Sequence, residues 1–324
     1  MRSFPVAPHL HTGGSLRPLV IATRGSRLAL WQAGHIQRLL AREYTRPVEL
    51  LAIKTRGDRL RQIPLAGAGD KGLFVREIED ALLESRADLA VHSLKDVPVE
   101  LRDGLTLGPV PRRGDEKDVL VSFAFAGLSA LPAGARVGTS SPRREVQLLA
   151  RRPDLVILPL RGNLDTRLRK LEAGECDAAV LAAAGLDRLG LLVPHRESLD
   201  PPAFLPAPGQ GALGLEFRAD REDLPPLLAF LNHEPSRLRA EAERAFLAGL
   251  GLGCQAPAAA WAVLDQDSPA RHASLTLEGL LASTDGKTLW RRQRRGPAKL
   301  ARQIGLDLAE EIKAAAGLAP SLSL

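Results

Sequence analysis

A lysine and an aspartate stand side by side in a short polar segment of the chain. Lys95 and Asp96 lie in the sequence VHSLKDVP, directly after the apolar run Leu89 to Val91. In open α/β sheets, ligands bind in loops at the carboxyl ends of strands. A lysine offers a point positive charge, and an aspartate can accept a proton or stabilise a cation. The pair is therefore a candidate for acid–base chemistry, although neighbours of this kind are more often an exposed ion pair on a turn.

Three turns have the composition of anion-binding sites. Each follows an apolar run and precedes a segment with helical spacing: Arg24 to Ser26, Gly138 to Arg144, and Arg161 to Asn163 with Arg167 one turn later. A helix start offers free backbone N–H groups, and a guanidinium adds a charge that suits carboxylate or phosphate. One such turn alone is most simply a capped helix with a surface arginine, and Ser26 is a suitable N-cap. Three together predict a small, strongly anionic ligand.

The elements that must position these residues alternate along the chain. Strands are predicted at Val48 to Lys54, Leu89 to Val91, Leu155 to Leu160, Ala178 to Leu181 and Ala212 to Phe217, and helices at Ser26 to Ala41, Leu73 to Ser85, Arg143 to Ala150 and Leu164 to Ala173. This alternation predicts an α/β fold. Two proline-rich segments, Pro109 to Lys117 and Asp200 to Gly209, interrupt it and are expected to cross between domains.

The pattern changes after about His233 to that of a small α+β module. A helix is predicted at Pro235 to Leu247, then strands near Ala258 to Leu264, Leu275 to Leu281 and Thr288 to Arg294, then a helix at Pro297 to Ala316. An Asp-Gly turn within Thr284 to Lys287 joins the last two strands. The arginine run Arg291 to Arg295 is expected to be a solvated edge strand.

Composition excludes several classes of protein. The net charge is +6, yet aromatic residues make up only 4% and there is one Tyr, so stacking platforms for nucleic-acid bases are scarce. The longest apolar stretch, near Ala178 to Gly185, falls well short of the roughly 18 residues of a membrane helix. Residues 1–18 have no apolar core of the secretory type and are expected to be a loose tail. The protein is expected to stay in the cytoplasm.

The two cysteines are expected to differ in role. Neither lies in a spacing that binds zinc, so no metal is predicted, and a disulfide is improbable in such a chain. Cys176 precedes an apolar run and is expected to pack as a small hydrophobic residue. Cys254 lies in the glycine-rich segment Gly249 to Pro257, where a thiol could be exposed and carry an attached group, although an incidental buried cysteine is an equal alternative.

Eight segments of the chain form an ordered set of motifs. The segments are ATRGSRLALWQA (22 to 33), TRGD (55 to 58), KGLFVREIE (71 to 79), VHSLKDVP (91 to 98), GTSSPRR (138 to 144), LRGN (160 to 163), PGQGALG (208 to 214) and GCQAP (253 to 257). In this order they resemble the porphobilinogen deaminase family, and the resemblance covers nearly everything from Leu19 to Ala316.

The resemblance implies an activity and a set of site residues. The family joins four porphobilinogen units head to tail into hydroxymethylbilane, with release of ammonia, on a dipyrromethane primer held by a thioether. The resemblance makes Asp96 the catalytic carboxylate and also a cofactor-binding residue, and it makes Cys254 the covalent attachment point. The residues implied to hold the carboxylates of the primer are Lys95, Thr139, Ser141, Arg143 and Arg144. Those implied to bind side chains of the primer or of the incoming substrate are Arg24, Ser26, Arg161, Arg167 and Arg188.

The resemblance also implies a three-domain monomer. Domain 1 would comprise residues 19–112 and 211–229, domain 2 residues 113–210, and domain 3 residues 230–324 with the cysteine. The first two would resemble periplasmic binding proteins with a cleft between them, and Arg56 to Lys71 would be a mobile loop over that cleft. The alternative is a non-catalytic two-lobed anion-binding protein, which would have no use for Cys254.

Overall fold

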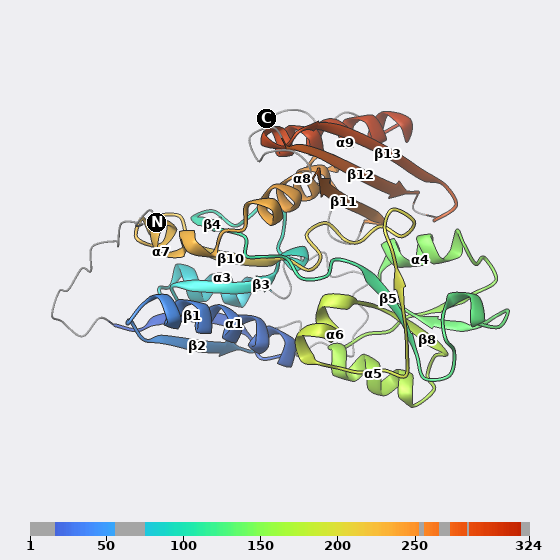
Figure 1. The fold of residues 1–324 in the computed structure, drawn as a ribbon, viewed down its shortest axis with the longest axis horizontal. Coiled ribbons are helices and arrows are strands. Elements are labelled where there is room, and N and C mark those ends of the chain that lie inside the picture. The colour runs from blue at the N-terminus through green and yellow to red at the C-terminus, as the bar shows by residue number, and fades with distance from the viewer. Residues whose placement is uncertain (1–16, 56–74, 253–255, 266–272, 284, 319–324) are drawn as a thin grey trace, which may run out of the picture.

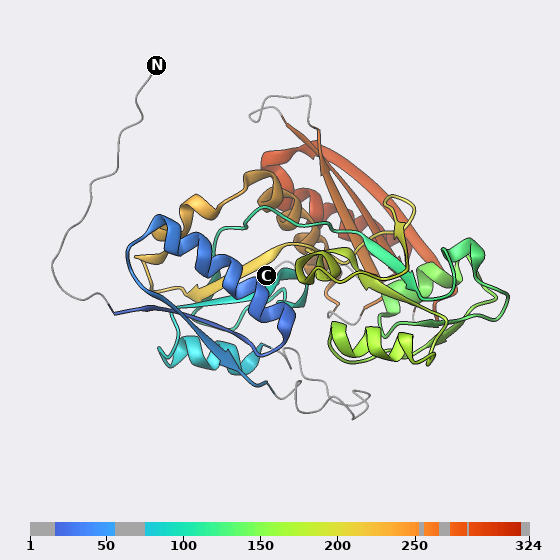
Figure 2. The ribbon, with the colours of Figure 1, turned by 60° about the horizontal axis from the view of Figure 1, so that its bottom comes forward.

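The computed structural model describes residues 17–55, 75–252, 256–265, 273–283 and 285–318. They form three lobes, each built on its own sheet (Figures 1 and 2). Three predicted features lie outside the described residues. They are the loop Arg56 to Lys71 over the cleft, the attachment residue Cys254, and residues 1–16 of the tail.

The first sheet has five strands in the order β2-β1-β3-β10-β4. The strands are β1 (Leu19–Arg24), β2 (Val48–Ile53), β3 (Leu89–Ser93), β4 (Leu105–Leu107) and β10 (Leu213–Arg218). Strands β2, β1 and β3 are parallel, and β10 is antiparallel to both β3 and β4. Strand β10 belongs to the second stretch predicted for domain 1, although the predicted domain boundaries themselves stay a prediction.

Two helices cover opposite faces of this sheet, because neighbouring side chains on each strand point to opposite sides. Helix α1 (Arg27–Glu43) packs Ile36 into a cluster with Ile21, whereas α3 (Arg76–Leu83) packs Ile78 into another cluster with Ala22. The central strands β1, β3 and β10 are therefore buried on both sides, as their largely apolar sequence requires, whereas the edge strand β2 is partly exposed.

The second sheet also has five strands, in the order β7-β6-β8-β5-β9. They are β5 (Asp118–Ser122), β6 (Arg136–Gly138), β7 (Val156–Leu158), β8 (Ala178–Ala182) and β9 (His195–Leu199), with helices α4 (Pro142–Leu149), α5 (Leu164–Glu172) and α6 (Ala183–Leu189). Helix α6 packs beside α1 of the first lobe (Figures 1 and 2). Cys176 is buried in an apolar cluster with Leu160, which confirms its predicted packing role.

Two crossings connect these sheets. Residues 109–117 lead from β4 to β5, and residues 200–209 lead from β9 back towards β10. Both proline-rich segments therefore cross between the lobes, as predicted.

The third lobe is a three-stranded antiparallel sheet with two helices packed on it. It contains α8 (Glu234–Leu250), β11 (Ala258–Leu264), β12 (Ser274–Ala282), β13 (Leu289–Pro297) and α9 (Ala301–Ala315), preceded by the short helix α7 (Leu224–Leu228). Helices α8 and α9 approach closely at Gly305, where a Cβ would lie 2.3 Å from the carbonyl oxygen of Ala242. Strand β13 lies at the sheet edge, which confirms the expectation for the arginine run.

The last helix begins later than predicted. Pro297 still pairs with Ser274 as the final residue of β13, and a single 3-10 turn, Ala298–Leu300, separates it from α9. In the described part of the chain no helix is both long and apolar enough to span a membrane.

Candidate active site

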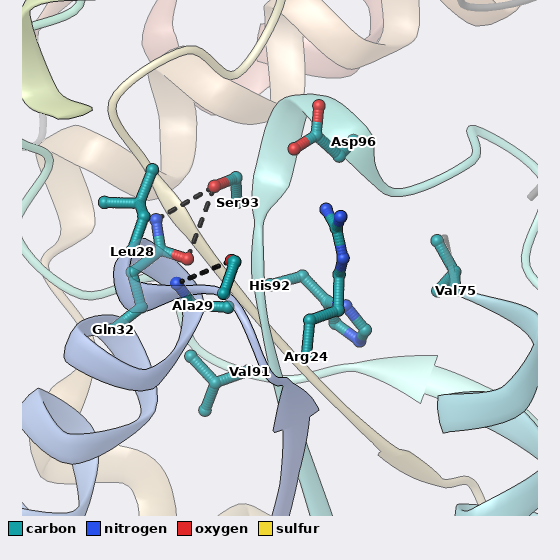
Figure 3. A pocket seen from close by; sticks show the side chains of 10 residues that line it. Arg24, Leu28, Ala29, Gln32, Val75, Val91, His92, Ser93 and Asp96 are labelled. Atoms are coloured by element: carbon teal, nitrogen blue, oxygen red, sulfur yellow. Dashed lines mark hydrogen bonds between the residues drawn. The ribbon is translucent and has the colours of Figure 1, made fainter. Parts of the chain in front are cut away.

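The first sheet presents its candidate residues at one edge. Parallel strands β1 and β3 end at Arg24 and Ser93, and the 3-10 turn η1 (Leu94–Asp96) follows β3 directly. Arg24, Ser93 and Asp96 line one pocket together with Ser26 and His92 (Figure 3). The structure therefore confirms that Lys95 and Asp96 lie at the carboxyl end of a sheet strand, as predicted.

Helix α1 begins at this pocket. The Ser26 side chain accepts a hydrogen bond from the backbone N–H of Ala29 at 3.3 Å, which confirms its predicted role as N-cap. One turn later the Gln32 amide donates to the Ser93 hydroxyl at 2.9 Å and fixes the helix to the end of β3. The guanidinium of Arg24 extends upward towards Asp96 (Figure 3). An anion in the pocket would meet both a capped helix start and a cation.

Lys95 and Asp96 differ in their surroundings. Asp96 is exposed, so its carboxylate is accessible to a ligand. The Lys95 ammonium donates to the side-chain oxygen of Gln210 at 3.0 Å. Burial lowers the pKa of Lys95 to about 8, and the neighbouring charge of Asp96 opposes that change.

The second sheet places its turns at the corresponding edge. Thr139 and Ser141 follow β6, and Arg143 and Arg144 lie in the first turn of α4. Both arginines are buried and bind the fully buried carboxylate of Asp118, at 2.6 Å from Arg143 and 2.7 Å from Arg144. Burial alone would raise the pKa of Asp118, but the two guanidiniums outweigh it and hold that pKa far below its usual range.

This ion-paired cluster carries a net positive charge, because one carboxylate faces two guanidiniums. The expected contacts of Arg143 and Arg144 with primer carboxylates stay a prediction. Part of each hydrogen-bonding fork is already used inside the protein: Arg143 also donates to the carbonyl of Leu205, and Arg144 to that of Val180.

The third turn faces the first lobe. Arg161 follows β7, and Asn163 caps α5 by accepting from the backbone N–H of Thr166 at 3.0 Å. Arg167 is fixed by a hydrogen bond from its Nε to the carbonyl of Gly162 at 2.9 Å. Burial and then the charge of Arg144 lower the pKa of Arg167 to about 10, while Asp96 of the first lobe opposes this. Asp96 and Arg167, from different sheets, are thus within electrostatic reach of each other.

Arg188 lies at the junction of the two lobes. It belongs to the last turn of α6, donates to the carbonyl of Gly211 at 2.6 Å, and its guanidinium lies 5.8 Å from the ring centre of Trp31 on α1. Burial lowers its pKa to about 10. It is not among the described residues that line the pocket of Asp96.

Two residues of this arrangement, Asp118 and Gln210, were not predicted from the sequence as site residues. Asp118 follows a proline-rich crossing and starts β5, which the sequence analysis did not predict as a strand, and Gln210 lies inside the PGQG motif without a charge to mark it. Only the structure brings them together: Gln210 donates to Asp118 at 3.0 Å and accepts from Lys95. The PGQG motif is the feature of the sequence from which a role for Gln210 could have been predicted.

The donor set suits an anionic organic group. Lys95, Arg143, Arg144 and Arg167 gather around two carboxylates, Asp96 and Asp118. Burial disfavours the charged forms of Lys95 and Arg167, and a carboxylate placed beside them would favour those charged forms again. Carboxylates at this place would therefore be strongly held. A dipyrromethane with acetate and propionate side chains fits these residues. No group of side chains able to hold a metal ion occurs in the described ranges.

Comparison with known proteins gives concordant results. A family model described as porphobilinogen deaminase, dipyromethane cofactor binding domain, matches residues 19–225, and one for the C-terminal domain of porphobilinogen deaminase matches residues 237–314. A protein named porphobilinogen deaminase from Nitratidesulfovibrio vulgaris (strain DP4) is 58% identical over 301 residues, which is 92% of this chain and 94% of that protein. Another of that name from Chromobacterium violaceum is 51% identical over 295 residues, 91% of this chain and 94% of that protein.

A solved structure, that of a probable amino-acid ABC transporter extracellular-binding protein from Bacillus subtilis, covers 67% of this chain and 90% of its own, with 11% identity and a TM-score of 0.42. The fold assignment rests on the two five-stranded α/β lobes and the small third lobe themselves. With family models matched over most of its length and relatives more than half identical to it, the chain belongs to the porphobilinogen deaminase family.

Proposed function

We propose that Asp96 is the catalytic carboxylate with which this chain carries out the reaction of its family. The chain is a transferase of tetrapyrrole biosynthesis that joins four porphobilinogen units into hydroxymethylbilane and releases ammonia. The observation that carries the assignment is the position of Asp96: an exposed carboxylate at the end of a sheet strand, in a pocket with Arg24 and within electrostatic reach of Arg167.

The chemistry needs a carboxylate at such a place. The amino group of the aminomethyl side chain of porphobilinogen leaves as ammonia when its C–N bond breaks, and the electron-deficient methylene left behind is attacked by the free α-carbon of the terminal ring of the growing oligopyrrole. That carbon then loses its proton. A carboxylate beside the ring nitrogens stabilises the positive charge that develops and can receive the proton. Asp96 is therefore assigned both roles.

The cations hold the carboxylate side chains of the rings. Lys95, Arg143 and Arg144, with the hydroxyls of Thr139 and Ser141, are assigned to the dipyrromethane, which supplies the α-carbon to which the first new unit is joined. Arg24, Ser26, Arg161, Arg167 and Arg188 are assigned to primer or incoming substrate. The position of Arg24 in the pocket of Asp96 and the charge interaction of Arg167 with Asp96 support the assignment of these two arginines to groups bound beside Asp96.

Cys254 is assigned as the thioether attachment point. Helix α8 ends at Leu250, and Gly251 adopts a left-handed conformation that turns the chain out of the helix. In the sequence Cys254 follows the end of this helix within the glycine-rich segment Gly249 to Pro257, and this composition supports the assignment.

Intact mass of the denatured protein tests this assignment together with the reaction. The purified chain should carry a two-pyrrole excess that grows ring by ring on brief exposure to porphobilinogen, and Cys254→Ala should show neither. A Cys254→Ala protein that still carries the excess would contradict the attachment point, and an unmodified wild type after prolonged loading with porphobilinogen would favour the non-catalytic alternative. Cys176→Ala, which removes a buried thiol, is the matched control.

The proposal extends to the setting of the enzyme. A monomer in the cytoplasm that binds no nucleic acid is expected; two cysteines and an aromatic content of 4% support the last two points. Sedimentation equilibrium of the loaded enzyme tests the monomeric state.

A further inference from the structure

Gln210 occupies the point where the chain returns from the second lobe to the first. It lies between β9 and β10, and none of its surface is exposed. Its backbone is held on both sides: its N–H donates to the carbonyl of Ala207 at 2.9 Å, and its carbonyl accepts from Nε of Arg113 at 2.6 Å. The side chain therefore starts from a fixed place.

The side-chain amide uses both of its N–H groups and its oxygen in hydrogen bonds. Its oxygen accepts from the Lys95 ammonium at 3.0 Å, and its nitrogen donates to Asp118 Oδ1 at 3.0 Å and to the carbonyl of Glu116 at 2.8 Å. An ammonium can only donate and an ionised carboxylate can only accept, so the amide has one possible orientation. Gln210 is thus a directional link between a cation of the first lobe and an anion of the second.

The link joins groups that the proposed function uses. Lys95 adjoins Asp96 in η1, and Asp118 holds Arg143 and Arg144 at the start of α4. A partly buried ammonium is more readily kept charged when it has acceptors. The oxygen of Gln210 supplies one, while its N–H stabilises the anion that anchors the two arginines.

We propose that Gln210 is a positioning residue of the primer site: its amide keeps Lys95 charged and fixes it against the Asp118 cluster, so that cations from both lobes face the primer's carboxylates together. The inference rests on the assignment of these cations to the primer. Gln210 itself acts only through Lys95 and Asp118.

The charge of Lys95 is the readout that separates positioning from packing. The charged groups facing its ammonium are Asp96 on its own turn, Asp118 on β5, and Arg143 and Arg144 on α4. None of these groups is itself replaced when Gln210 is substituted. A change in the pKa of Lys95 in an uncharged Gln210 variant therefore reports the loss of the amide's contacts with Lys95 and Asp118.

The experiment is NMR titration of the lysine Cε–Hε signals in the loaded enzyme, with the Lys95 signal assigned by Lys95→Met. Gln210→Met keeps the shape but removes the acceptor, so the pKa of Lys95 should fall by about one pH unit below its wild-type value of about 8. Gln210→Glu retains an oxygen facing the ammonium, so the pKa should stay at or above the wild-type value. Primer loading from porphobilinogen should slow about 10-fold in Gln210→Met and recover at least partly in Gln210→Glu.

Gln147→Met is the matched control. Gln147 is also a buried glutamine, and it bonds the backbone of Arg143 and Leu205 instead of Lys95. Its substitution should leave the pKa of Lys95 unchanged. An unchanged pKa in Gln210→Met, or equal falls in Gln210→Met and Gln210→Glu, would overturn the proposal. Failure of the primer assignment would look different: Lys95→Met would load primer at the wild-type rate.

Discussion

Asp96 differs from the other carboxylates of the site in being exposed, whereas Asp118 is fully buried between two arginines. Replacing Asp96 by Asn keeps the shape of the side chain and removes its charge and its ability to take up a proton. We expect Asp96→Asn to fold and carry primer but to lose about 10²- to 10⁴-fold in kcat, the usual contribution of a positioned acid–base group. Steady-state assays with porphobilinogen, alongside intact mass, measure both properties.

Asp103→Asn is the control for that variant, since Asp103 is another exposed aspartate between β3 and β4. It should keep the wild-type kcat. A wild-type kcat in Asp96→Asn would contradict the proposed catalytic role of the carboxylate.

Arg167 and Arg169 provide a matched pair on one helix. Arg167 is half-buried and within electrostatic reach of Asp96 and Arg144, whereas Arg169 is exposed. A hydrogen bond to a charged group is worth about 1.5 to 3 kcal/mol, so Arg167→Leu should raise the KM for porphobilinogen by about 10- to 100-fold. Arg169→Leu should leave KM unchanged, and equal effects of the two substitutions would show that Arg167 contributes no specific contact.

At the scale of elements, Asp118 ties the start of β5 to the start of α4. Removing one partner of a buried ion pair leaves uncompensated charge, at a cost of about 3 to 5 kcal/mol. We expect Asp118→Asn to lower the free energy of unfolding by that amount in urea titrations. Asp154→Asn, which breaks a solvent-screened surface pair with Arg152, should leave the free energy of unfolding nearly unchanged. A loss of unfolding free energy of similar size in both variants would mean that burial does not make the ion pairs of Asp118 more important for stability than an exposed pair.

The same carboxylate predicts a pH dependence of stability. Because the folded-state pKa of Asp118 is held below the unfolded value, its contribution is fully present above the unfolded pKa and is lost as pH falls through the folded pKa. Wild-type stability should therefore decline below about pH 4, the ordinary pKa of an aspartate, and the Asp118→Asn protein should decline less steeply. Urea midpoints measured between pH 5 and pH 2.5 give both slopes.

Sequence periodicity predicted the strongly patterned elements and missed those without a pattern. The helices at α1, α5 and α8 and the strands β2, β8 and β11 lie where the apolar spacing placed them. Strand β9 was missed because His195–Leu199 is largely polar, as an edge strand can be. Helix α6 was missed because it continues directly from the apolar run of β8 without a turn signal.

The candidate site shows the same division. Ser26 was identified as a cap because its residue type and position are sufficient for that role. Asp118 and Gln210 could not be found in that way, since their importance comes from contacts with Arg144 and Lys95 that are distant in sequence. Long-range pairing of polar groups leaves no periodic signal.

For the whole molecule, the third lobe is joined to the crossings by a buried ion pair. Glu243 of α8 binds Arg113 of the first crossing at 2.8 Å and also accepts from the backbone N–H of Gly209 in the second crossing and of Ala262 in β11. One carboxylate thus connects both crossings to the lobe that carries Cys254. Since Arg113 and Glu243 are almost completely buried, the contact cannot be replaced by water without cost.

This connection predicts how the protein unfolds. In Glu243→Gln the Arg113 guanidinium loses its charged partner, so the melting temperature should fall and the third lobe should unfold in a separate transition before the two α/β lobes. Differential scanning calorimetry should show one transition in the wild type and two in the variant. Glu241→Gln alters an exposed carboxylate on the same helix and should melt like the wild type. A single transition at an unchanged temperature in Glu243→Gln would mean that apolar packing alone, such as that of Leu205 with Ala259 and Leu280, holds the third lobe in place.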